Sequence, residues 1–411
     1  MRRVVVTGLG VVSSLGHDPD TLFSRLMQAE SGIRLVSAYG SVGSHTGIAG
    51  IVDFVPRVSL PAGQKTDNLD RISQFALAAA TSAVDDAAFE FTEENTRRTG
   101  ISLGTGMGAT SSIEDAYVQV LLGDANRVKP LTILKVMGNA AASHVAIRYG
   151  LSGPNLSYFC ACASSTVAIG EAARQIRHGY ADAMIAGGTE SILSFGSFKT
   201  WAAMRVLASI DPLDPATSCK PFSKNRSGLV LGEGAAMVML EERESAKRRG
   251  ARIYGELVGY GSSNDFTHIT MPTVEGQAQA MTLALADAKM SGDDVDYINA
   301  HGTATALNDV TETRAIKQVF GAHAYRVPVS STKSMHGHLL GGAGAMEFVI
   351  AMLAMKHQAI PPTAHLDTPD PECDLDYVPG QGRDDQPVAC IMSNSFAFGG
   401  TNAVLIARAD R

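Results

Sequence analysis

Cys160 and Cys162 are separated by one residue in the segment FCACASS, and two thiols this close together suggest chemistry. Such a pair is typical of a metal site, a disulfide, a nucleophile or a buried core. A metal site is disfavoured, because no second cysteine pair and no nearby histidine completes a zinc set around C-x-C. A disulfide framework is disfavoured too, because the five cysteines are odd in number and widely spaced.

The residues after Cys162 predict a helix, and this helix distinguishes the two cysteines. Apolar residues recur with helical spacing over 167–176, and Gly179 is a fitting end. Cys162 would then lie at a helix N-terminus, where free N–H groups and the helix dipole lower a thiol pKa. Cys160 lies two residues earlier, where the helix N-terminus has little effect on a thiol pKa, so we interpret it as a buried core residue. For Cys162 the nucleophile and the core residue stay about equally supported.

Two of the eleven histidines lie on glycine-rich turns. His301 follows the apolar run 295–300 in the segment AHGTAT, and His338 lies in STKSMHGHLLGGAG. Small neighbours let backbone and substrate approach closely, so two such histidines in one chain favour catalysis over a structural role. His336 shares the setting of His338, and spacing alone does not rank the two. Near the C-terminus, SNSFAFGGTN predicts a tight turn, either an ordinary hairpin or one whose N–H groups form an oxyanion hole.

These side chains must be held by an alternation of strands and helices. Short apolar runs predict buried strands at 4–6, 101–103, 183–186, 236–240, 327–329 and 403–406. Helical spacing predicts helices at 74–87, 167–177, 278–288 and 345–355. The alternation indicates βαβ units around parallel sheets, which build sites at the carboxyl ends of their strands. Cys162 and His301 both follow a predicted strand in this way.

No linker rich in Pro and Ser divides the 411 residues, but the basic turn at 247–252 is a plausible midpoint. We predict two units, 1–250 with the nucleophilic cysteine and 251–411 with the histidines. The matching positions of Cys162 and His301 suggest a duplication.

The composition, with 45% apolar and 6% aromatic residues and 41 glycines, suits an α/β protein. A net charge of −7 argues against nucleic acid as a partner. The N-terminal arginines and apolar run resemble a signal peptide, but Thr7, Gly8 and Gly10 interrupt the run. We predict instead a first buried strand that ends in a glycine turn. No run approaches the roughly 20 apolar residues of a membrane span, so we expect a soluble cytoplasmic protein.

Six stretches of the chain together resemble the elongating β-ketoacyl-[acyl-carrier-protein] synthases, most closely those of type II. In order they are MRRVVVTGLGVVSSLG, CACASS, PFSKNRSGLVLGEGAA, NAHGTAT, STKSMHGHLLGGAGAME and SNSFAFGGTN. The resemblance implies the thiolase fold, in which two similar βαβ halves form a five-layered α-β-α-β-α sandwich, usually as a homodimer. It implies an acyltransferase that condenses an acyl-enzyme thioester with malonyl-acyl-carrier protein and releases carbon dioxide.

The resemblance also assigns roles to residues. The nucleophile falls on Cys162, and Cys160 occupies a position where hydroxyl residues are usual. The catalytic histidines fall on His301 and His338, while His336 lies where Thr is common and is not catalytic.

Supporting roles follow in the same way. Lys333 matches the motif lysine and is counted among the catalytic residues, where it is expected to orient His338 and tune the local field. Glu312, in the D-x-x-E segment that begins at Asp309, is expected to pair with Lys333. Thr303 and Thr305 match positions that hold the phosphopantetheine arm.

The resemblance extends to the gate and the acyl pocket. Phe398 matches the family's gatekeeper, and its backbone N–H and that of Cys162 are expected to form the oxyanion hole. Met107 falls where the acyl pocket is lined. No metal or redox cofactor is implied, because the prosthetic arm comes with the acyl carrier protein.

The acyl carrier protein is acidic, so a basic patch is expected around the entrance. The candidates for docking it are Lys65, Arg127, Lys129 and Arg205.

Several residues depart from the fatty-acid pattern and support an alternative. Ala397 replaces a Gly between two phenylalanines, Ala306 and Asn308 replace Pro and Gly, and Ser227 replaces Asp. A dedicated ketosynthase of a type II polyketide, polyene or specialised lipid pathway, possibly paired with a chain-length-factor subunit, is therefore the alternative.

Other classes fit less well. A thiolase needs no second histidine, an initiating synthase would have Asn there, and a cysteine hydrolase does not explain Lys333. The chain is not expected to be a chain-length factor itself, because those subunits lack the nucleophile.

Overall fold

The computed structural model describes residues 1–410 except 41–42, 56, 59 and 61–65. Its main sheet has ten strands in the order β11-β10-β12-β13-β9-β1-β8-β6-β4-β5. Five of them come from the first part of the chain: β1 (Val4–Val12), β4 (Thr99–Gly104), β5 (Asn155–Tyr158), β6 (Ala183–Glu190) and β8 (Gly234–Glu242). The other five come from the second part: β9 (Gly255–Asn264), β10 (Tyr297–Asn299), β11 (Val329–Ser330), β12 (Cys390–Phe396) and β13 (Thr401–Arg408).

The two sets of five strands repeat one topology. Outward from the middle, the first set runs β1, β8, β6, β4, β5 and the second runs β9, β13, β12, β10, β11. If the strands of each set are numbered one to five along the chain, both sets have the same spatial order from the middle outward: one, five, four, two, three. The sets join through a short antiparallel pairing in which Val5 faces Glu256 and Val6 faces Gly255. This repetition agrees with the duplication suggested by the positions of Cys162 and His301.

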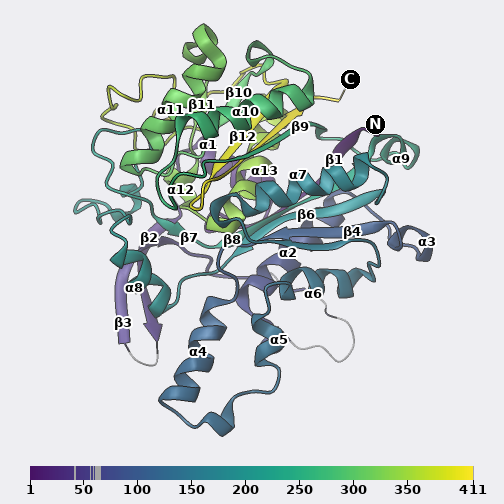
Figure 1. The fold of residues 1–411 in the computed structure, drawn as a ribbon, viewed down its shortest axis with the longest axis vertical. Coiled ribbons are helices and arrows are strands. Elements are labelled where there is room, and N and C mark those ends of the chain that lie inside the picture. The colour runs from purple at the N-terminus through teal and green to yellow at the C-terminus, as the bar shows by residue number, and fades with distance from the viewer. Residues whose placement is uncertain (41–42, 56, 59, 61–65, 411) are drawn as a thin grey trace.

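Helices form three layers around the two sets of strands. The central layer is α7 (Ser164–Arg177) and α13 (Ala343–His357), which contact each other between the sets (Figure 1). On the far side of the first set lie α2 (Arg71–Asp86) and α6 (Ala140–Tyr149), and on the far side of the second lie α10 (Val274–Ala288) and α11 (Ala306–Phe320). The result is the predicted α-β-α-β-α sandwich.

The remaining elements connect or cap these layers. They are α1 (Pro19–Met27), β2 (Ile33–Gly40), β3 (Gly43–Gly50), α3 (Glu93–Thr96), α4 (Thr110–Leu121), α5 (Thr132–Val136), α8 (Phe195–Ala203), β7 (Leu231–Gly232), α9 (Arg243–Arg248) and α12 (Lys333–His336). The strands β2, β3 and β7 form a second, small sheet. The helices α4 and α5 project from the body of the molecule (Figure 1).

Burial explains why the sandwich forms. Every residue of α13 from Ala343 to Met355 is buried, as expected for a helix that is covered by sheets on both sides. Gly8 and Gly10 of β1 face α2, where a Cβ atom would lie 2.0 Å from a carbonyl oxygen of that helix. These two glycines therefore allow the helix to pack directly on the strand.

The predicted elements are present, with two differences. All four predicted helices overlap observed ones, and the predicted strands lie in β1, β4, β6, β8, β11 and β13. The first strand does not end at a glycine turn, because β1 continues through Gly8 and Gly10 to Val12 with a bulge after Val6. The predicted strand at 327–329 begins later, at Val329, after Pro328. Among the described residues, no helix is long and apolar enough to cross a bilayer.

Candidate active site

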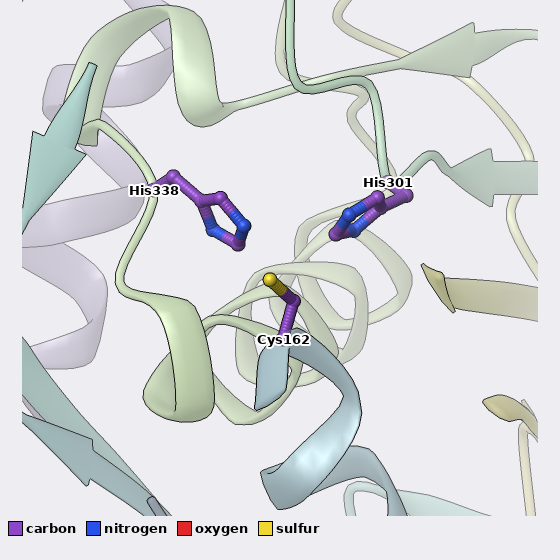
Figure 2. A group of neighbouring side chains, drawn as sticks. All are labelled: Cys162, His301 and His338. Carbon is purple, nitrogen blue, oxygen red and sulfur yellow. The ribbon is translucent and has the colours of Figure 1, made fainter. Parts of the chain in front are cut away.

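Cys162 lies in a 3₁₀ turn, Ala161–Ala163, that leads directly into α7. The residue before it, Ala161, has a φ of +46°, a conformation that non-glycine residues rarely adopt. Ser164 fixes this turn, because its Oγ accepts a hydrogen bond from the N–H of Cys160 at 2.8 Å and donates one to the carbonyl of Ala161 at 2.7 Å. The turn therefore aims the Cys162 side chain away from α7, toward two histidine rings (Figure 2).

The three side chains form one cluster. The Sγ of Cys162 and ring nitrogens of His301 and His338 all lie within 4.8 Å of one another. The imidazole rings of His301 and His338 have centroids 5.3 Å apart and are nearly perpendicular. Figure 2 shows both rings pointing at the sulfur from two different loops. The structure thus brings together three of the four residues that the sequence predicts as catalytic, and the fourth, Lys333, lies next to His301.

The thiol differs from the prediction in its protonation. We expected the helix N-terminus to lower the pKa of Cys162, but burial raises it to about 12. The positive charge of Lys333 and a hydrogen bond from the backbone N–H of Phe398 act in the opposite direction. Burial dominates because the side chain is almost completely removed from water. The resting sulfur is therefore a thiol, and it needs a base when it reacts.

His338 is held by its backbone and leaves its ring free. Its N–H donates to the carbonyl of Val230 at 2.7 Å, and its own carbonyl accepts from Gly232 at 2.9 Å. Both ring nitrogens are buried and have no hydrogen-bond partner among the described residues. Burial, and then the charge of Lys333, hold the pKa of His338 well below its ordinary value. A neutral imidazole with unused donor and acceptor positions is suited to exchange protons with a bound substrate.

His301 follows β10 and is oriented by Lys333. The Lys333 ammonium donates to the carbonyl of His301 at 2.5 Å and lies 3.4 Å from its Nδ1. If Nδ1 accepts from the ammonium, the ring proton is on Nε2 and faces the cluster. Burial and the Lys333 charge keep the pKa of His301 well below its ordinary value. The prediction that Lys333 orients His338 is therefore wrong, because Lys333 contacts His301.

The partner of Lys333 also differs from the prediction. Glu347 of α13, not Glu312, forms the ion pair with Lys333, and both side chains have no exposure to solvent. Glu312 instead accepts hydrogen bonds from the backbone N–H groups of His301 and Gly302, each at 2.8 Å. Glu312 lies on α11 beside the turn after β10, so it reaches that backbone rather than the lysine. Glu312 and Lys333 thus hold the same histidine from different sides.

His336 is outside the cluster, as predicted. Its ring bonds the carbonyl of Gly337 at 2.7 Å through Nδ1 and the hydroxyl of Thr332 at 3.0 Å through Nε2. Burial lowers its pKa to about 3. Both nitrogens are occupied, so this ring stabilises the turn before His338.

A cavity of about 300 Å³ leads to the cluster. Cys162, His301 and His338 lie on its wall together with Thr303 and Thr305, the predicted arm-binding residues. The hydroxyls of Thr303 and Thr305 lie 2.9 Å apart, and Thr305 caps α11. This volume is at the lower end of the range for small-molecule sites.

The loop that carries Thr303 and Thr305, called the threonine loop below, is held by buried charged side chains. Asp309 accepts a hydrogen bond from the N–H of Phe222 at 2.8 Å, which agrees with its predicted supporting role. Arg226 donates to the carbonyls of Thr305 and Ala306 and to the carboxylate of Asp370.

The predicted gate lies at the same cavity. Phe398 lines it, and the adjacent turn has two glycines in the left-handed region, Gly399 with a φ of +88° and Gly400 with a φ of +81°. Ala397 does not have a positive φ, and its N–H donates to the carbonyl of Thr401 at 2.9 Å. The methyl group of Ala397 is therefore compatible with this turn.

Cys162, His301 and His338 are also residue types that bind metal ions, although the sequence interpretation implies no metal at this site. A closed structural zinc site has four protein ligands, whereas this group offers three. The two unused nitrogens of His338 and the adjoining cavity fit a reacting substrate.

The predicted docking residues are found in two places. Arg205 is exposed at the wall of the main cavity. Arg127 and Lys129 are exposed on the segment between α4 and α5, where they line a separate groove with Lys135. Lys65 lies outside the described residues. Met107 is 39% exposed and is not one of the described residues that line the main cavity.

Three functional residues escaped the sequence interpretation. Glu347 is the only charged residue before Lys356 in α13, and a lone carboxylate in a buried helix signals a buried partner. Glu190, at the end of β6, accepts hydrogen bonds from the backbone N–H groups of Gly106 and Gly341 and so connects two loops. Trp201 lines the cavity without belonging to a predicted motif.

Two family models match this chain. The model described as "Beta-ketoacyl synthase, N-terminal domain" matches residues 1–246, and "Beta-ketoacyl synthase, C-terminal domain" matches residues 254–367. The chain belongs to the β-ketoacyl synthase family. This synthase is an enzyme of the condensing acyltransferase type, and the resemblance stated from its motifs is confirmed.

Relatives of known description agree. The synthase is 44% identical to "3-oxoacyl-[acyl-carrier-protein] synthase 2" of Coxiella burnetii, with 98% of each chain covered. It is 42% identical to the protein of the same name from Synechocystis, with 98% of this chain and 97% of the relative covered. It is also 44% identical to "Nodulation protein E" of Rhizobium leguminosarum bv. trifolii, with 99% of each covered.

Solved structures confirm the thiolase fold. A type II polyketide ketosynthase, solved with its acyl carrier protein, superposes with a TM-score of 0.92 at 35% identity over all of both chains. A β-ketoacyl synthase from Burkholderia phymatum gives a TM-score of 0.90 at 35% identity, again over both whole chains.

Proposed function

We propose that this synthase elongates acyl chains by decarboxylative condensation of an acyl group on Cys162 with malonyl-acyl-carrier protein. The observation that carries the proposal is the convergence of one thiol and two neutral imidazoles at the wall of a cavity of about 300 Å³. The product is β-ketoacyl-acyl-carrier protein, and the malonyl group loses carbon dioxide. The names of the relatives support the same reaction.

The first half-reaction loads the enzyme. The acyl-carrier thioester enters with its carbonyl against the backbone N–H of Phe398, which already points at the Cys162 sulfur. The thiol proton leaves to an imidazole as the sulfur attacks, because burial keeps the resting thiol protonated. Collapse of the tetrahedral intermediate breaks the thioester bond, and the carrier thiol takes a proton and departs. The acyl group remains on Cys162.

The second half-reaction forms the carbon–carbon bond. The malonyl thioester places its carbonyl oxygen between His301 and His338, where ring N–H groups donate to it. Loss of carbon dioxide leaves its electron pair on the adjacent carbon, and the negative charge spreads onto that oxygen. The carbanion attacks the acyl carbonyl on Cys162, and the carbon–sulfur bond breaks. The sulfur takes up one proton from solvent through a neighbouring imidazole, and the site returns to its resting state.

Lys333 and Glu312 keep His301 in position for this step. The Lys333 ammonium next to Nδ1 favours a proton on Nε2, and Glu312 holds the backbone. Thr303 and Thr305 are placed to bind the phosphopantetheine arm along the cavity wall. No metal and no redox cofactor takes part in this scheme, since decarboxylation supplies the carbon nucleophile.

The partners follow from the same reaction. The acyl carrier protein docks at the cavity mouth, where Arg205 is exposed. The synthase acts as a homodimer, because exposed apolar side chains gather on α4, α5 and the end of β5, which is an open sheet edge. They are Tyr117, Val120, Leu121, Leu131, Ile133, Leu134, Met137 and Phe159. We place it in the cytoplasm, where its five free cysteines stay reduced.

A second function has a specific observation in its favour. One chain of the structure described as "The ishigamide ketosynthase/chain length factor" superposes with a TM-score of 0.89 at 34% identity. A dedicated polyketide, polyene or lipid pathway would use the same chemistry with a different partner subunit on the apolar surface. Light scattering of the purified protein separates the two: a stable dimer of one chain supports the homodimer, and a monomer supports the second function.

The test of the reaction is loading of Cys162. Incubation with acyl-acyl-carrier protein should add the acyl mass to the peptide that carries Cys162, and adding malonyl-acyl-carrier protein should discharge it as the β-ketoacyl product. Cys160→Ala is the matched control and should load normally, whereas Cys162→Ala should not load. Loading of Cys162→Ala, or wild-type protein that never loads, would contradict the proposal.

A further inference from the structure

Trp201 is the only tryptophan of the chain, and it stands at the boundary between the cavity and Met107. It belongs to an apolar cluster that also contains Cys162, and it is only 9% exposed. Neither the catalytic cluster nor the threonine loop uses it. A large buried aromatic side chain beside the nucleophile therefore needs an explanation of its own.

The indole makes two specific contacts. Its Nε1–H donates to the sulfur of Met107 at 3.3 Å. Its ring stacks on that of Phe398, with centroids 6.3 Å apart and planes inclined by 21°. Trp201 thus connects the predicted gate to the residue predicted to line the acyl pocket, and it fills the space between them.

The helix that carries Trp201 is rigidly mounted. Its N-cap, Ser194, accepts from the N–H of Ser197 and donates to the carboxylate of Glu114 at 2.9 Å. Glu114, on α4, also accepts from the N–H of Gly196 at 2.6 Å. These bonds fix the start of α8 against α4, so the indole is presented by a fixed backbone.

The cavity ends at this ring. Trp201 and Phe398 line the cavity, whereas Met107 lies beyond them and is partly exposed. Met137 and Phe159 are also exposed in the single chain, and they belong to the apolar surface that is proposed to form the dimer interface. An acyl chain on Cys162 that grows toward this apolar surface must therefore displace Trp201.

We propose that Trp201 is a specificity-determining residue that limits the length of the acyl chain carried by Cys162. The inference rests on the proposed condensing function. Short acyl chains fit on the thiol side of the indole, and long ones must break its contacts with Met107 and Phe398. The residue acts on substrate choice and takes no part in the bond-making steps.

The test compares Trp201→Ala, Trp201→Phe and Met107→Leu with wild-type protein, using butyryl- and dodecanoyl-acyl-carrier protein. The ratio of kcat/KM for dodecanoyl over butyryl should rise by on the order of tenfold in Trp201→Ala, since a hydrophobic pocket separates homologues by this factor or more. Trp201→Phe keeps a ring but loses the N–H, and Met107→Leu loses the sulfur acceptor, so both should shift the ratio in the same direction but by less than Trp201→Ala does. Lys199→Ala, exposed on the same helix, is the matched control and should leave it unchanged.

The wild-type protein gives a second readout, because its indole fluorescence comes from this one tryptophan. Loading of Cys162 with dodecanoyl should shift the emission, loading with butyryl should not, and Cys162→Ala should show neither change. This readout decides the inference if Trp201→Ala fails to fold. The inference is overturned if loading is normal and the kcat/KM ratio is unchanged in the folded variants. It is also overturned if dodecanoyl loads normally and the emission does not shift. Failure of every acyl group to load overturns the proposed function instead.

Discussion

Replacing Glu312 with glutamine tests the finding that this carboxylate holds the backbone of His301. Each of its oxygens accepts one backbone N–H at 2.8 Å, from His301 and from Gly302, and the side chain is fully buried. The amide introduced by Glu312→Gln would turn one acceptor into a donor that faces an N–H group. One charge-assisted hydrogen bond is then lost and the other becomes neutral.

The magnitude follows from these contacts. A hydrogen bond to a charged group contributes about 1.5–3 kcal/mol, and a buried donor without a partner costs about 1–3 kcal/mol. The free energy of unfolding should therefore fall by about 3 kcal/mol. Displacement of the imidazole should also lower kcat by roughly a hundredfold, since misplacement by about 1 Å has such an effect.

The assays are urea denaturation and steady-state condensation, with Glu372→Gln as the matched control. Glu372 is exposed and pairs with Arg314 of α11 at 2.7 Å, so its loss should change the unfolding free energy by under about 1 kcal/mol. Double-mutant cycles with Lys333→Met complete the test. The coupling energy of Lys333 with Glu347 should exceed its coupling with Glu312. A larger coupling with Glu312, or a loss of stability no greater than in the control, would refute the reasoning.

The remaining predictions concern pH and the gate turn. The folded-state pKa of His301, His336 and His338 lies below the unfolded value near 6.5, so the unfolded chain binds more protons in acid. The free energy of unfolding should thus fall as pH drops below about 6.5, by up to about 1.4 kcal/mol per pH unit for each histidine. His336→Asn should remove the contribution of one histidine from the measured slope of unfolding free energy against pH. In the gate turn, Gly400→Ala should destabilise more than Gly399→Ala, as measured by thermal denaturation. Both substitutions place an alanine at a positive φ, but among the described residues a Cβ at Gly400 would lie 3.1 Å from Asp265, whereas a Cβ at Gly399 would meet nothing. Equal losses of thermal stability in the two variants would contradict this.

The sequence carried enough information to predict the fold and the central trio. Cys162, His301 and His338 each follow a strand or a glycine turn within a distinct motif, and motifs of this kind fix backbone positions. The layered architecture followed from alternating apolar runs and helical spacing, because buried strands and central helices leave strong patterns.

Contacts between distant side chains were harder to predict. Lys333 could reach carboxylates on two helices, α11 and α13, and only their packing selects Glu347 over Glu312. The prediction of a lowered pKa for the Cys162 thiol was wrong for a similar reason. A helix N-terminus can be recognised in the sequence, whereas the depth of burial depends on the whole fold. Trp201 belongs to no motif, and its neighbours Met107 and Phe398 come from segments far from it along the chain.

The repeated architecture has a consequence for the way the protein is made. A ribosome completes the first set of strands and α7 well before it reaches α13, the helix that covers α7 from the other side. Until then, the nascent chain exposes apolar surface that the finished protein buries, which is the state in which chains aggregate or recruit chaperones. The thiol of Cys162 is made early, but His338 arrives only with the segment that closes the sandwich. The enzyme therefore stays inactive throughout synthesis, and its first turnover reports that the two halves have docked.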